Sequence, residues 1–171
     1  MPAGIPERLT WAVEMLAVEP ADQVLEIGCG PGVAVSLICK RIGGGRVTAI
    51  DRSAVMVRRA LERNQAHVAA GRASIEQRAL EDADFGPARF HRVLAVNVNA
   101  FWTRPAAPLD AVRRCLAPGG TVLLVYQPPS ASRARQLADV LGAHLPEHGL
   151  AVRSLTVRER APVPLLGVVA G

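Results

Sequence analysis

Short apolar runs alternate with helix-forming segments along most of the chain, and this alternation restricts the folds open to it. The runs that predict strands are Gln23–Ile27, Arg46–Ile50, Ala73–Gln77, Arg92–Val96, Thr121–Tyr126, Ala151–Val157 and Val163–Val169. The segments that predict helices are Leu9–Leu16, Val33–Ile42, Ala54 to about Gln65, Pro108–Cys115 and Ala131–Leu145. Strands that alternate with helices imply right-handed βαβ units and a mostly parallel sheet.

The last two predicted strands depart from this alternation because no helix separates them. Their linker, residues 158–162, is too short for a parallel crossover, so the two strands must pair antiparallel. A turn is expected at Pro118–Gly120, and Pro146 is expected to end the last helix. We therefore predict one α/β domain over residues 1–171. It has a doubly wound, mostly parallel seven-stranded sheet, an antiparallel C-terminal hairpin strand and helices on both faces, and residues 1–22 form a short N-terminal helical cap.

Composition excludes several classes of protein. The chain has 20 basic and 15 acidic residues, and Lys40 is the only lysine among the basic ones. The arginines are dispersed rather than clustered, so a nucleic-acid partner is not favoured. No apolar run approaches the ~18 residues of a membrane span. Cys29, Cys39 and Cys115 are odd in number and widely spaced, which fits neither a disulfide framework nor a metal site. We expect a cytoplasmic protein that has no metal site and no association with a membrane.

A glycine-rich turn follows the first predicted strand. Gly28, Gly30 and Gly32 alternate with other residues in the run Val24–Gly32. Glycines there let the backbone turn sharply and let a ligand approach the first turn of the next helix. A tight strand-to-helix turn without a ligand is the alternative. The dinucleotide fingerprint needs its third glycine where Val33 stands, so pyrophosphate binding is disfavoured.

Asp51 follows the second predicted strand and is the acidic partner of the glycine turn. A carboxylate at this position can accept hydrogen bonds from both hydroxyls of a ribose. The alternative is an acid placed at the N-terminus of the helix that Ser53 caps. Ligands of doubly wound sheets bind at the carboxyl ends of the strands. The residues expected there are 28–32, 51, 79–80, 97–99 and 126–129.

These segments resemble the class I S-adenosylmethionine-dependent methyltransferases. The resemblance rests on VLEIGCGPG at 24–32 followed by AIDRSAVMVRRA at 49–60. ALEDADF at 79–85, RVLAVNVNAFW at 92–102 and LAPGGTVLLV at 116–125 are similar to later family segments and come in the family's order. The resemblance implies S-adenosylmethionine as cofactor and S-adenosylhomocysteine as product.

The resemblance also implies roles at the methionine and ribose ends of the cofactor. Gly28 and Gly30 would line its methionine part through their backbones, with Glu26 nearby supporting the amino group. The backbone around Asn97 would meet the same amino group. Asp51 would hold the ribose hydroxyls.

At the adenine end the chain departs from the family. Arg52 would flank the adenine with its backbone and aliphatic stem. Ala79 stands where the family usually has an aspartate that accepts from the adenine amino group, while the backbone N–H of Leu80 remains. Glu81 and Asp82 are the candidates to compensate for the lost acceptor.

The sequence names no catalytic base. Methyl transfer needs a base only when the acceptor must lose a proton, and the polar residues expected at the ligand edge are weak bases: Asn97, Asn99, Tyr126 and Gln127. Trp11, Phe101 and Trp102 either wall a pocket or pack in the core. The chain has little material for a lid, so the acceptor site is expected to be open or completed by a partner, for which a second copy of the chain is a candidate.

Three functions remain open at this point. The first is methyl transfer to an unidentified acceptor, and a small molecule is favoured because the arginines are dispersed. The second is an RNA or protein methyltransferase, supported by the basic pI of about 10.0 and the uncovered edge. The third is a non-catalytic cofactor-binding or interaction protein, supported by the missing adenine acceptor and the absent base. A dehydrogenase is the remaining and least favoured alternative.

Overall fold

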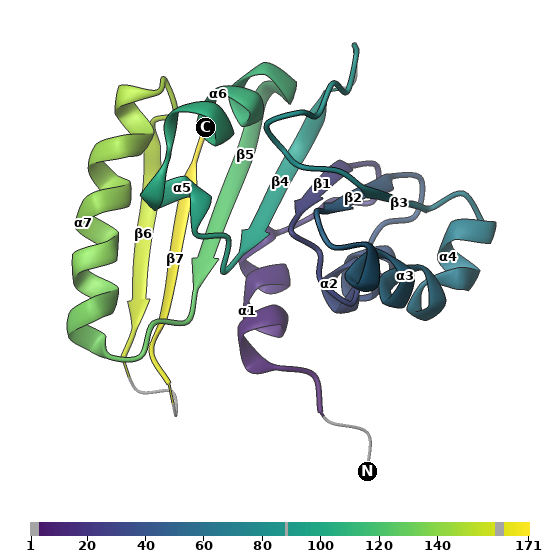
Figure 1. The fold of residues 1–171 in the computed structure, drawn as a ribbon, viewed down its shortest axis with the longest axis horizontal. Coiled ribbons are helices and arrows are strands. Elements are labelled where there is room, and N and C mark those ends of the chain that lie inside the picture. Colours follow the sequence, from purple (N-terminus) through teal and green to yellow (C-terminus); the bar gives the residue numbers. More distant parts are fainter. Residues whose placement is uncertain (1–3, 88, 160–162) are drawn as a thin grey trace.

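A single sheet organises the chain in the computed structural model, which describes residues 4–87, 89–159 and 163–171. The seven-stranded sheet has the order β3-β2-β1-β4-β5-β7-β6 (Figure 1). The strands are β1 (Gln23–Ile27), β2 (Arg46–Asp51), β3 (Ala73–Gln77), β4 (Phe90–Val96), β5 (Leu116–Tyr126), β6 (Val152–Arg158) and β7 (Leu165–Ala170). Each predicted strand is therefore confirmed; most ends differ by two residues or fewer, but β5 begins at Leu116 and not at Thr121.

The directions of the strands also agree with the prediction. β1 pairs parallel with both β2 and β4, so the strand order reverses between β1 and β4. β7 pairs antiparallel with β5 and with β6, which confirms the C-terminal hairpin, although residues 160–162 of its linker lie outside the described residues. In a sheet of this kind the crevice at the reversal point is where ligands bind.

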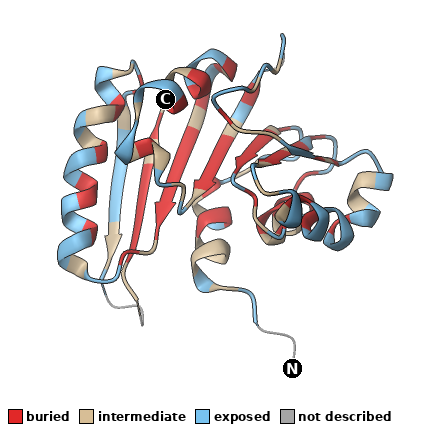
Figure 2. Cartoon of the chain, viewed as in Figure 1, coloured by how far each residue is buried: buried red, intermediate tan, exposed pale blue. Residues whose placement is uncertain are grey.

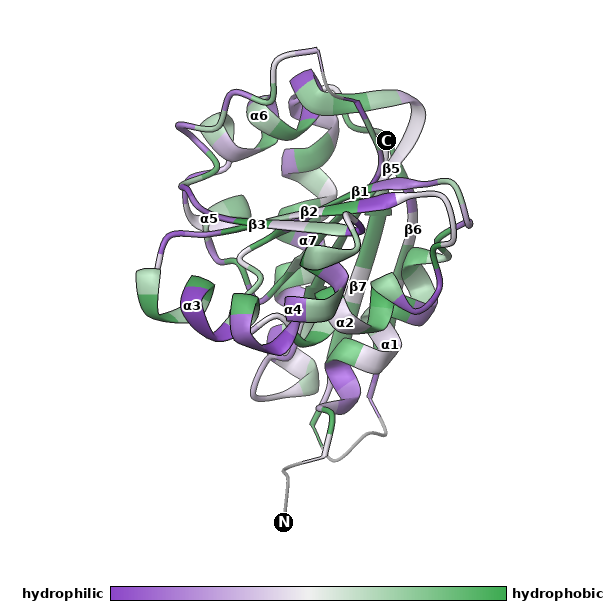
Figure 3. Ribbon diagram, turned by 90° about the vertical axis from the view of Figure 1, so that its right-hand side faces the viewer, coloured by the Kyte–Doolittle hydropathy of each residue, from purple (hydrophilic) through white to green (hydrophobic). Residues whose placement is uncertain are grey.

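Helices cover both faces of the sheet. They are α1 (Glu7–Leu16), α2 (Val33–Cys39), α3 (Ala54–Arg63), α4 (Gln65–Ala69), α5 (Ala100–Thr103), α6 (Ala106–Cys115) and α7 (Ala131–Glu147). Alternate residues of a strand point to opposite faces. Val24 accordingly packs in one core cluster with residues of α1, α2 and α3, whereas Leu25 packs in the other with residues of α5, α6 and α7. Figure 2 shows the central strands buried, and Figure 3 shows α2 and α6 on opposite sides of them.

Asn64 divides the helix that was expected to run from Ala54 to about Gln65. The amide of this fully buried side chain donates to the carbonyl oxygens of Gly32 and Ala60, both at 2.9 Å. Its Oδ1 accepts from the Ser36 hydroxyl at 2.7 Å. A side chain that bonds to backbone groups competes with helix continuation, so α3 ends at Arg63 and the short α4 follows.

Prolines explain two further differences from the prediction. α7 continues through Pro146 to Glu147 rather than ending at Leu145. A proline in the last turn removes only one hydrogen bond, so the helix tolerates it there. α6 begins at Ala106, which puts Pro108 in the first turn, where its missing N–H has no partner to lose.

Two loops also differ from the expected ones. Pro118–Gly120 is an irregular part of β5 and not a separate turn. Gly119 has a φ of +72° there, and the β4–β5 pairing shifts register between Phe90 and Arg92. The four residues of α5 had no signal in the sequence. Because α5 is short and directly follows β4, it lies beside the ligand edge of the sheet.

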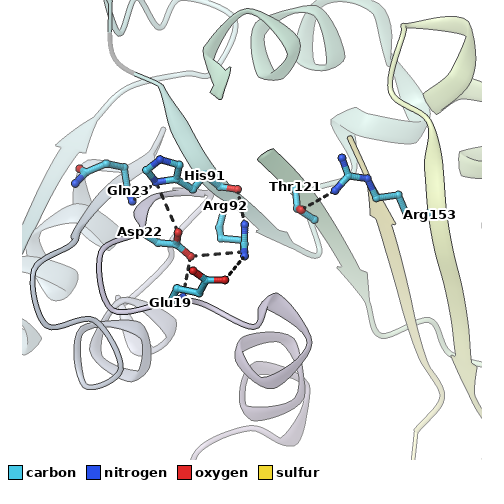
Figure 4. Close-up of polar contacts among 7 residues, drawn as sticks. All are labelled: Glu19, Asp22, Gln23, His91, Arg92, Thr121 and Arg153. Atoms are coloured by element: carbon cyan, nitrogen blue, oxygen red, sulfur yellow. Dashed lines mark hydrogen bonds and ion pairs between the residues drawn. The ribbon is translucent and has the colours of Figure 1, made fainter. Parts of the chain in front are cut away.

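A polar network fixes the amino ends of β1 and β4, opposite the ligand edge (Figure 4). The carboxylate of Asp22 accepts from the Glu19 N–H at 2.8 Å and lies 3.6 Å from the Arg92 guanidinium. Nδ1 of His91 accepts from the Gln23 N–H at 2.9 Å. His91 therefore joins the two strands, in agreement with the structural role that its place at the amino end suggests.

We expect Asp22→Ala to lower the free energy of unfolding by ~1–3 kcal/mol, because it removes a buried carboxylate that accepts from the Glu19 N–H and pairs with Arg92. The matched control is Glu19→Ala, whose side chain is 75% exposed and lies 3.8 Å from Arg92, so its loss should be ~0–1 kcal/mol. Urea unfolding followed by circular dichroism measures both. Equal losses in the two variants would contradict the role given to Asp22.

Candidate functional site

A pocket of about 350 Å³ opens at the carboxyl ends of β1, β2 and β4. Four stretches of chain enclose it: the end of β1, the end of β2, the loop after β3, and the segment that follows β4. Its lining residues are Ile27, Gly28, Ile50, Asp51, Arg52, Arg78, Leu80, Glu81, Asn97, Val98, Asn99, Ala100, Thr103, Arg104 and Pro108. The pocket thus lies at the reversal point of the strand order.

The pocket brings together most of the residues that the sequence singles out. Those that line it are Gly28, Asp51, Arg52, Leu80 and Asn97. Glu26, Gly30 and Ala79 do not line it. Ala79 lies between two lining residues, Arg78 and Leu80, in the loop after β3.

The glycine turn adopts a backbone that side chains disfavour. Gly28, Gly30 and Gly32 have φ values of +69°, +52° and +73°. A Cβ on Gly28 would come within 2.9 Å of the Val98 side chain, and one on Gly32 within 2.5 Å of the Asn64 amide. The first clash would fall in the pocket and the second behind the turn. Glycine therefore keeps the pocket open at Gly28 and lets α3 pack closely at Gly32.

Asp51 connects the glycine turn to the end of β2. One oxygen of its carboxylate accepts from the Gly30 N–H at 2.8 Å, and the other accepts from the Ser53 N–H at 2.9 Å. Gly30 itself does not line the pocket, and its N–H is directed at Asp51. A carboxylate has about four acceptor sites, so both oxygens keep capacity for a ligand.

Glu26 lies beneath the glycine turn, with only 3% of its surface exposed. Burial, and next the neighbouring charge of Asp51, raise the pKa of Glu26 from 4.5 to about 8, against a hydrogen bond from the Val35 backbone. Its Oε2 atom has no hydrogen-bond partner among the described residues. Buried polar atoms are rarely left unpaired, so this oxygen suggests a missing donor.

The cysteine of the glycine turn is not an activated nucleophile. Burial, followed by the charges of Glu26 and Asp51, raises the pKa of the Cys29 thiol to about 12. A thiolate, and not a thiol, is the reactive form of cysteine. Cys29 therefore stays in its thiol form at neutral pH and packs in the core beside the turn.

At the end of β4, Asn97 turns the chain toward the pocket. It has a φ of +57°, which asparagine tolerates better than most residues. Its backbone N–H donates to the Val125 carbonyl at 2.8 Å, and its side-chain oxygen accepts from the Gln127 N–H at 2.9 Å. Asn97 thereby ties the end of β4 to the end of β5.

Tyr126 and Gln127 do not line the pocket, although the sequence places them at the ligand edge. The Tyr126 hydroxyl donates to the Val98 carbonyl at 2.7 Å, and burial raises its pKa well above the usual value. The Gln127 side chain accepts instead from Arg8 of α1 at 3.2 Å. Both residues support the loop after β4 and supply no base.

The three candidate wall aromatics pack in the protein and do not line the pocket. Trp11 packs against Gly167 of β7, where an added Cβ would come within 3.0 Å of its ring. Phe101 is completely buried in the core. The ring of Trp102 lies 5.7 Å below the Arg133 guanidinium. Of the two interpretations left open by the sequence, core packing is the correct one.

Comparison with known proteins decides the family of this fold and site. A family model described as a methyltransferase domain matches residues 24–120, more than half of the 171 residues. The chain belongs to the class I S-adenosylmethionine-dependent methyltransferases. The chemistry of this family is methyl transfer from S-adenosylmethionine.

Individual relatives agree with this assignment. An uncharacterised methyltransferase of Bacillus subtilis is 24% identical over 79% of this chain and 72% of its own length. A trans-aconitate 2-methyltransferase of Acidovorax ebreus is 33% identical over 77% of this chain and 51% of its own. The crystal structure of a methyltransferase from Geobacter sulfurreducens with S-adenosyl-L-homocysteine has a TM-score of 0.70 at 17% identity, covering 98% of this chain and 91% of that one. The chain spans about half or less of most curated relatives it matches.

The residues of this methyltransferase fit the family's cofactor. S-adenosylmethionine carries an ammonium group and a sulfonium, both positive, and the unpaired Glu26 oxygen lies beneath the turn beside the pocket. Gly28 has no Cβ, and the space that a Cβ would fill leaves the backbone accessible to a ligand. The described residues contain no cluster of side chains able to hold a metal ion and no helix long and apolar enough to cross a membrane.

Some lining residues of this methyltransferase had no signal in the sequence. Thr103 and Arg104 reach the pocket because α5 folds back beside the sheet, which periodicity alone does not indicate. Arg104 is the only charged residue that the segment after β4 adds to the lining, and its side chain has no hydrogen bond or ion pair within the described residues. Arg78, by contrast, pairs with Glu76 at 3.0 Å.

The raised pKa of Glu26 makes stability depend on pH. Between pH 4.5 and about 8 the folded protein holds a proton that the unfolded chain releases. Rising pH therefore favours unfolding, by at most ~1.4 kcal/mol per pH unit. We expect Glu26→Gln to flatten this decline in the ligand-free protein, as measured by urea unfolding across this range. Glu62→Gln, an exposed position on α3, should keep the wild-type slope, and an unchanged slope in Glu26→Gln would contradict the prediction.

Proposed function

We propose that this protein transfers a methyl group from S-adenosylmethionine to a small molecule that carries a carboxylate. The observation that carries the proposal is the pocket, in which Asp51 and the glycine turn lie on one side and the unpaired Arg104 lies on the other. The first side suits a nucleoside cofactor, and the second suits an anionic acceptor. The bound cofactor supplies a methyl group that is already activated by its sulfonium.

On the cofactor side, Asp51 would accept hydrogen bonds from the ribose hydroxyls. Its carboxylate is held in place by the N–H groups of Gly30 and Ser53, so no side-chain rotation is needed for binding. Such preorganisation reduces the entropy lost when the ligand binds. The backbones of Gly28 and Asn97 and the carboxyl group of Glu26 would surround the methionine part. Glu26 would supply an acceptor for the ammonium group once it has lost its proton.

We expect Asp51→Ala to weaken S-adenosylmethionine binding ~10- to 150-fold, because ~1.5–3 kcal/mol of charged hydrogen bonding is lost. Isothermal titration calorimetry measures the affinity. Glu62→Ala removes an exposed carboxylate outside the pocket and should bind as wild type. Asp51→Asn is measured in parallel because Asp51 also anchors Gly30. This variant keeps one acceptor oxygen, so its affinity for S-adenosylmethionine should lie between those of Asp51→Ala and Glu62→Ala. Wild-type affinity in both Asp51 variants would sink the assignment.

The acceptor class is inferred from Arg104 and from the lining of the pocket, in which the carboxylates of Asp51 and Glu81 are the side chains able to accept a proton. None of the described residues that line the pocket is a histidine, lysine, cysteine or tyrosine. A carboxylate acceptor needs no base, since its pKa of ~4 leaves it ionised at neutral pH. A guanidinium is the side chain best suited to hold a carboxylate, through two parallel hydrogen bonds. The name of the Acidovorax relative, a trans-aconitate methyltransferase, supports an acid of this kind.

Positioning would supply most of the catalysis in this scheme. An in-line displacement requires the attacking oxygen to lie close to the methyl carbon, and holding two reactants in this way removes much of the barrier. Arg104 would fix one carboxylate of the acceptor while another carboxylate oxygen attacks. The side chains of Val98 and Pro108 would exclude water from the same wall.

We expect Arg104→Gln to lower kcat/KM for trans-aconitate ~10- to 150-fold, through loss of a charged hydrogen bond worth ~1.5–3 kcal/mol. Affinity for S-adenosylmethionine should stay unchanged. Methylated product is measured by mass spectrometry in a panel of carboxylic acids that includes trans-aconitate. Arg114→Gln, at an exposed position of α6 outside the pocket, is the matched control. Turnover of no acid in the panel, despite tight cofactor binding, would contradict the proposed acceptor class.

A further inference from the structure

A second cavity lies toward the amino ends of β1, β2 and β3, and we call it the sheet groove. Its volume is about 460 Å³, and it shares only Arg78 with the pocket that Asp51 lines. The connection from β3 to β4 contains no helix or strand in its described part, so no helix of that connection covers this face of the sheet (Figure 1). The strand residues that line the sheet groove are Gln23 of β1, Arg46 and Thr48 of β2, and Ser74 and Glu76 of β3.

Two hydroxyl groups lie side by side on the floor of the sheet groove. Thr48 and Ser74 are register partners in the parallel pairing of β2 and β3, and neighbouring strands lie ~4.8 Å apart. Both residues are half-buried, and neither side chain makes a hydrogen bond within the described residues. Buried polar groups normally have a partner. These two hydroxyls are therefore placed to donate to the same ligand.

Arg46 brings a positive charge to the same floor. It lies two residues before Thr48 on β2, so both side chains point to the same face of the sheet. Arg46 is exposed, and its guanidinium has no hydrogen bond or ion pair within the described residues. A guanidinium can donate two parallel hydrogen bonds to an oxyanion. The described chain thus leaves Arg46, Thr48 and Ser74 as three donors without an acceptor.

The two acids that line the sheet groove already have partners. Glu76 pairs with Arg78 at 3.0 Å. The Asp84 carboxylate accepts from the Gly86 N–H at 2.7 Å, and the Asp84 carbonyl accepts from Arg78 at 3.0 Å. The lining contains three arginines against these two acids, so its net charge is positive. The sheet groove therefore favours an anion over a cation.

An aromatic pair forms the side of the sheet groove next to the loop after β3. Phe85 and Phe90 pack edge to face, with ring centroids 5.2 Å apart. Phe90 is buried, whereas Phe85 is half-buried and keeps part of its ring accessible. Covering such a ring with an apolar group is favourable because it removes apolar surface from water. A ligand for this cavity would therefore combine an anionic group with an apolar body.

We propose that the sheet groove binds a phosphate monoester whose other end is a small aromatic body. A phosphoryl group has three acceptor oxygens, which match the donors of Arg46, Thr48 and Ser74. The aromatic body would lie against the accessible part of Phe85. This ligand is distinct from the methyl donor and the methyl acceptor, and the proposal does not depend on the proposed function.

Phenyl phosphate is the probe, and amide NMR titrations of the full chain measure its binding. We expect saturable shifts in the backbone amides at the amino ends of β2 and β3. Arg46→Gln should weaken binding ~10-fold or more, the value of one charged hydrogen bond. Thr48→Val keeps the shape of the side chain but loses the hydroxyl, so it should weaken binding ~2- to 10-fold.

Arg59→Gln, at an exposed position of α3 outside both cavities, is the matched control and should bind phenyl phosphate as wild type. Because Arg46 is exposed and has no partner in the described chain, Arg46→Gln should keep the wild-type melting temperature. Absence of saturable shifts in wild type would overturn the proposal. So would wild-type affinity in Arg46→Gln together with loss of binding in Arg104→Gln, since that result places the probe in the other pocket.

Benzoate separates a phosphate site from a general anion site. It has the same ring, but its carboxylate has two acceptor oxygens rather than three. We expect it to bind more weakly than phenyl phosphate by ~2- to 10-fold, the value of one ordinary hydrogen bond. Equal or tighter binding of benzoate would refute the assignment of a phosphate monoester.

Discussion

The contact between the Asp51 carboxylate and the Gly30 N–H holds the candidate site together. It joins the loop after β1 to the end of the neighbouring strand β2, beside the point between β1 and β4 where the strand order reverses. The same carboxylate orders the start of α3 through Ser53. Asn64 then holds the back of the glycine turn through the Gly32 carbonyl. The pocket therefore has a rigid floor that is built from backbone groups and is fixed before any ligand arrives.

The floor of the pocket includes two neighbouring acids, whose mutual repulsion a cationic ligand would relieve. Glu26 and Asp51 are neighbouring acids, and Glu26 is buried, so the ligand-free protein holds a proton there at neutral pH. A cation placed above the turn favours the ionised form of both acids. A buried acid such as Glu26 would destabilise a turn that had only a structural role. The same burial makes Glu26 a suitable partner for an ammonium or sulfonium group. We regard this as the strongest argument against a ligand-free role for the glycine turn.

The sequence predicted the features that short-range chemistry determines. β1 and β3 have the predicted ends because apolar runs stop at glycine or polar residues, and the hairpin of β6 and β7 followed from linker length alone. The break at Asn64 could not be predicted because it depends on a contact with Gly32, which is distant in sequence. Glu81 was one of two candidates, and Arg104 was missed, because their places depend on how loops fold back on the sheet.

The charges of the pocket also bear on what its substrate can be. On the side of β2 and β3, the lining has two acids, Asp51 and Glu81, and two arginines, Arg52 and Arg78. The segment after β4 contributes Arg104 as its single charge. Arg104 is exposed and has no counter-charge among the described residues, so an anionic acceptor on that side would find a guanidinium ready to pair with it. The carboxylate of the proposed acceptor would also be its own ionised nucleophile, so the property that favours binding would make a general base unnecessary.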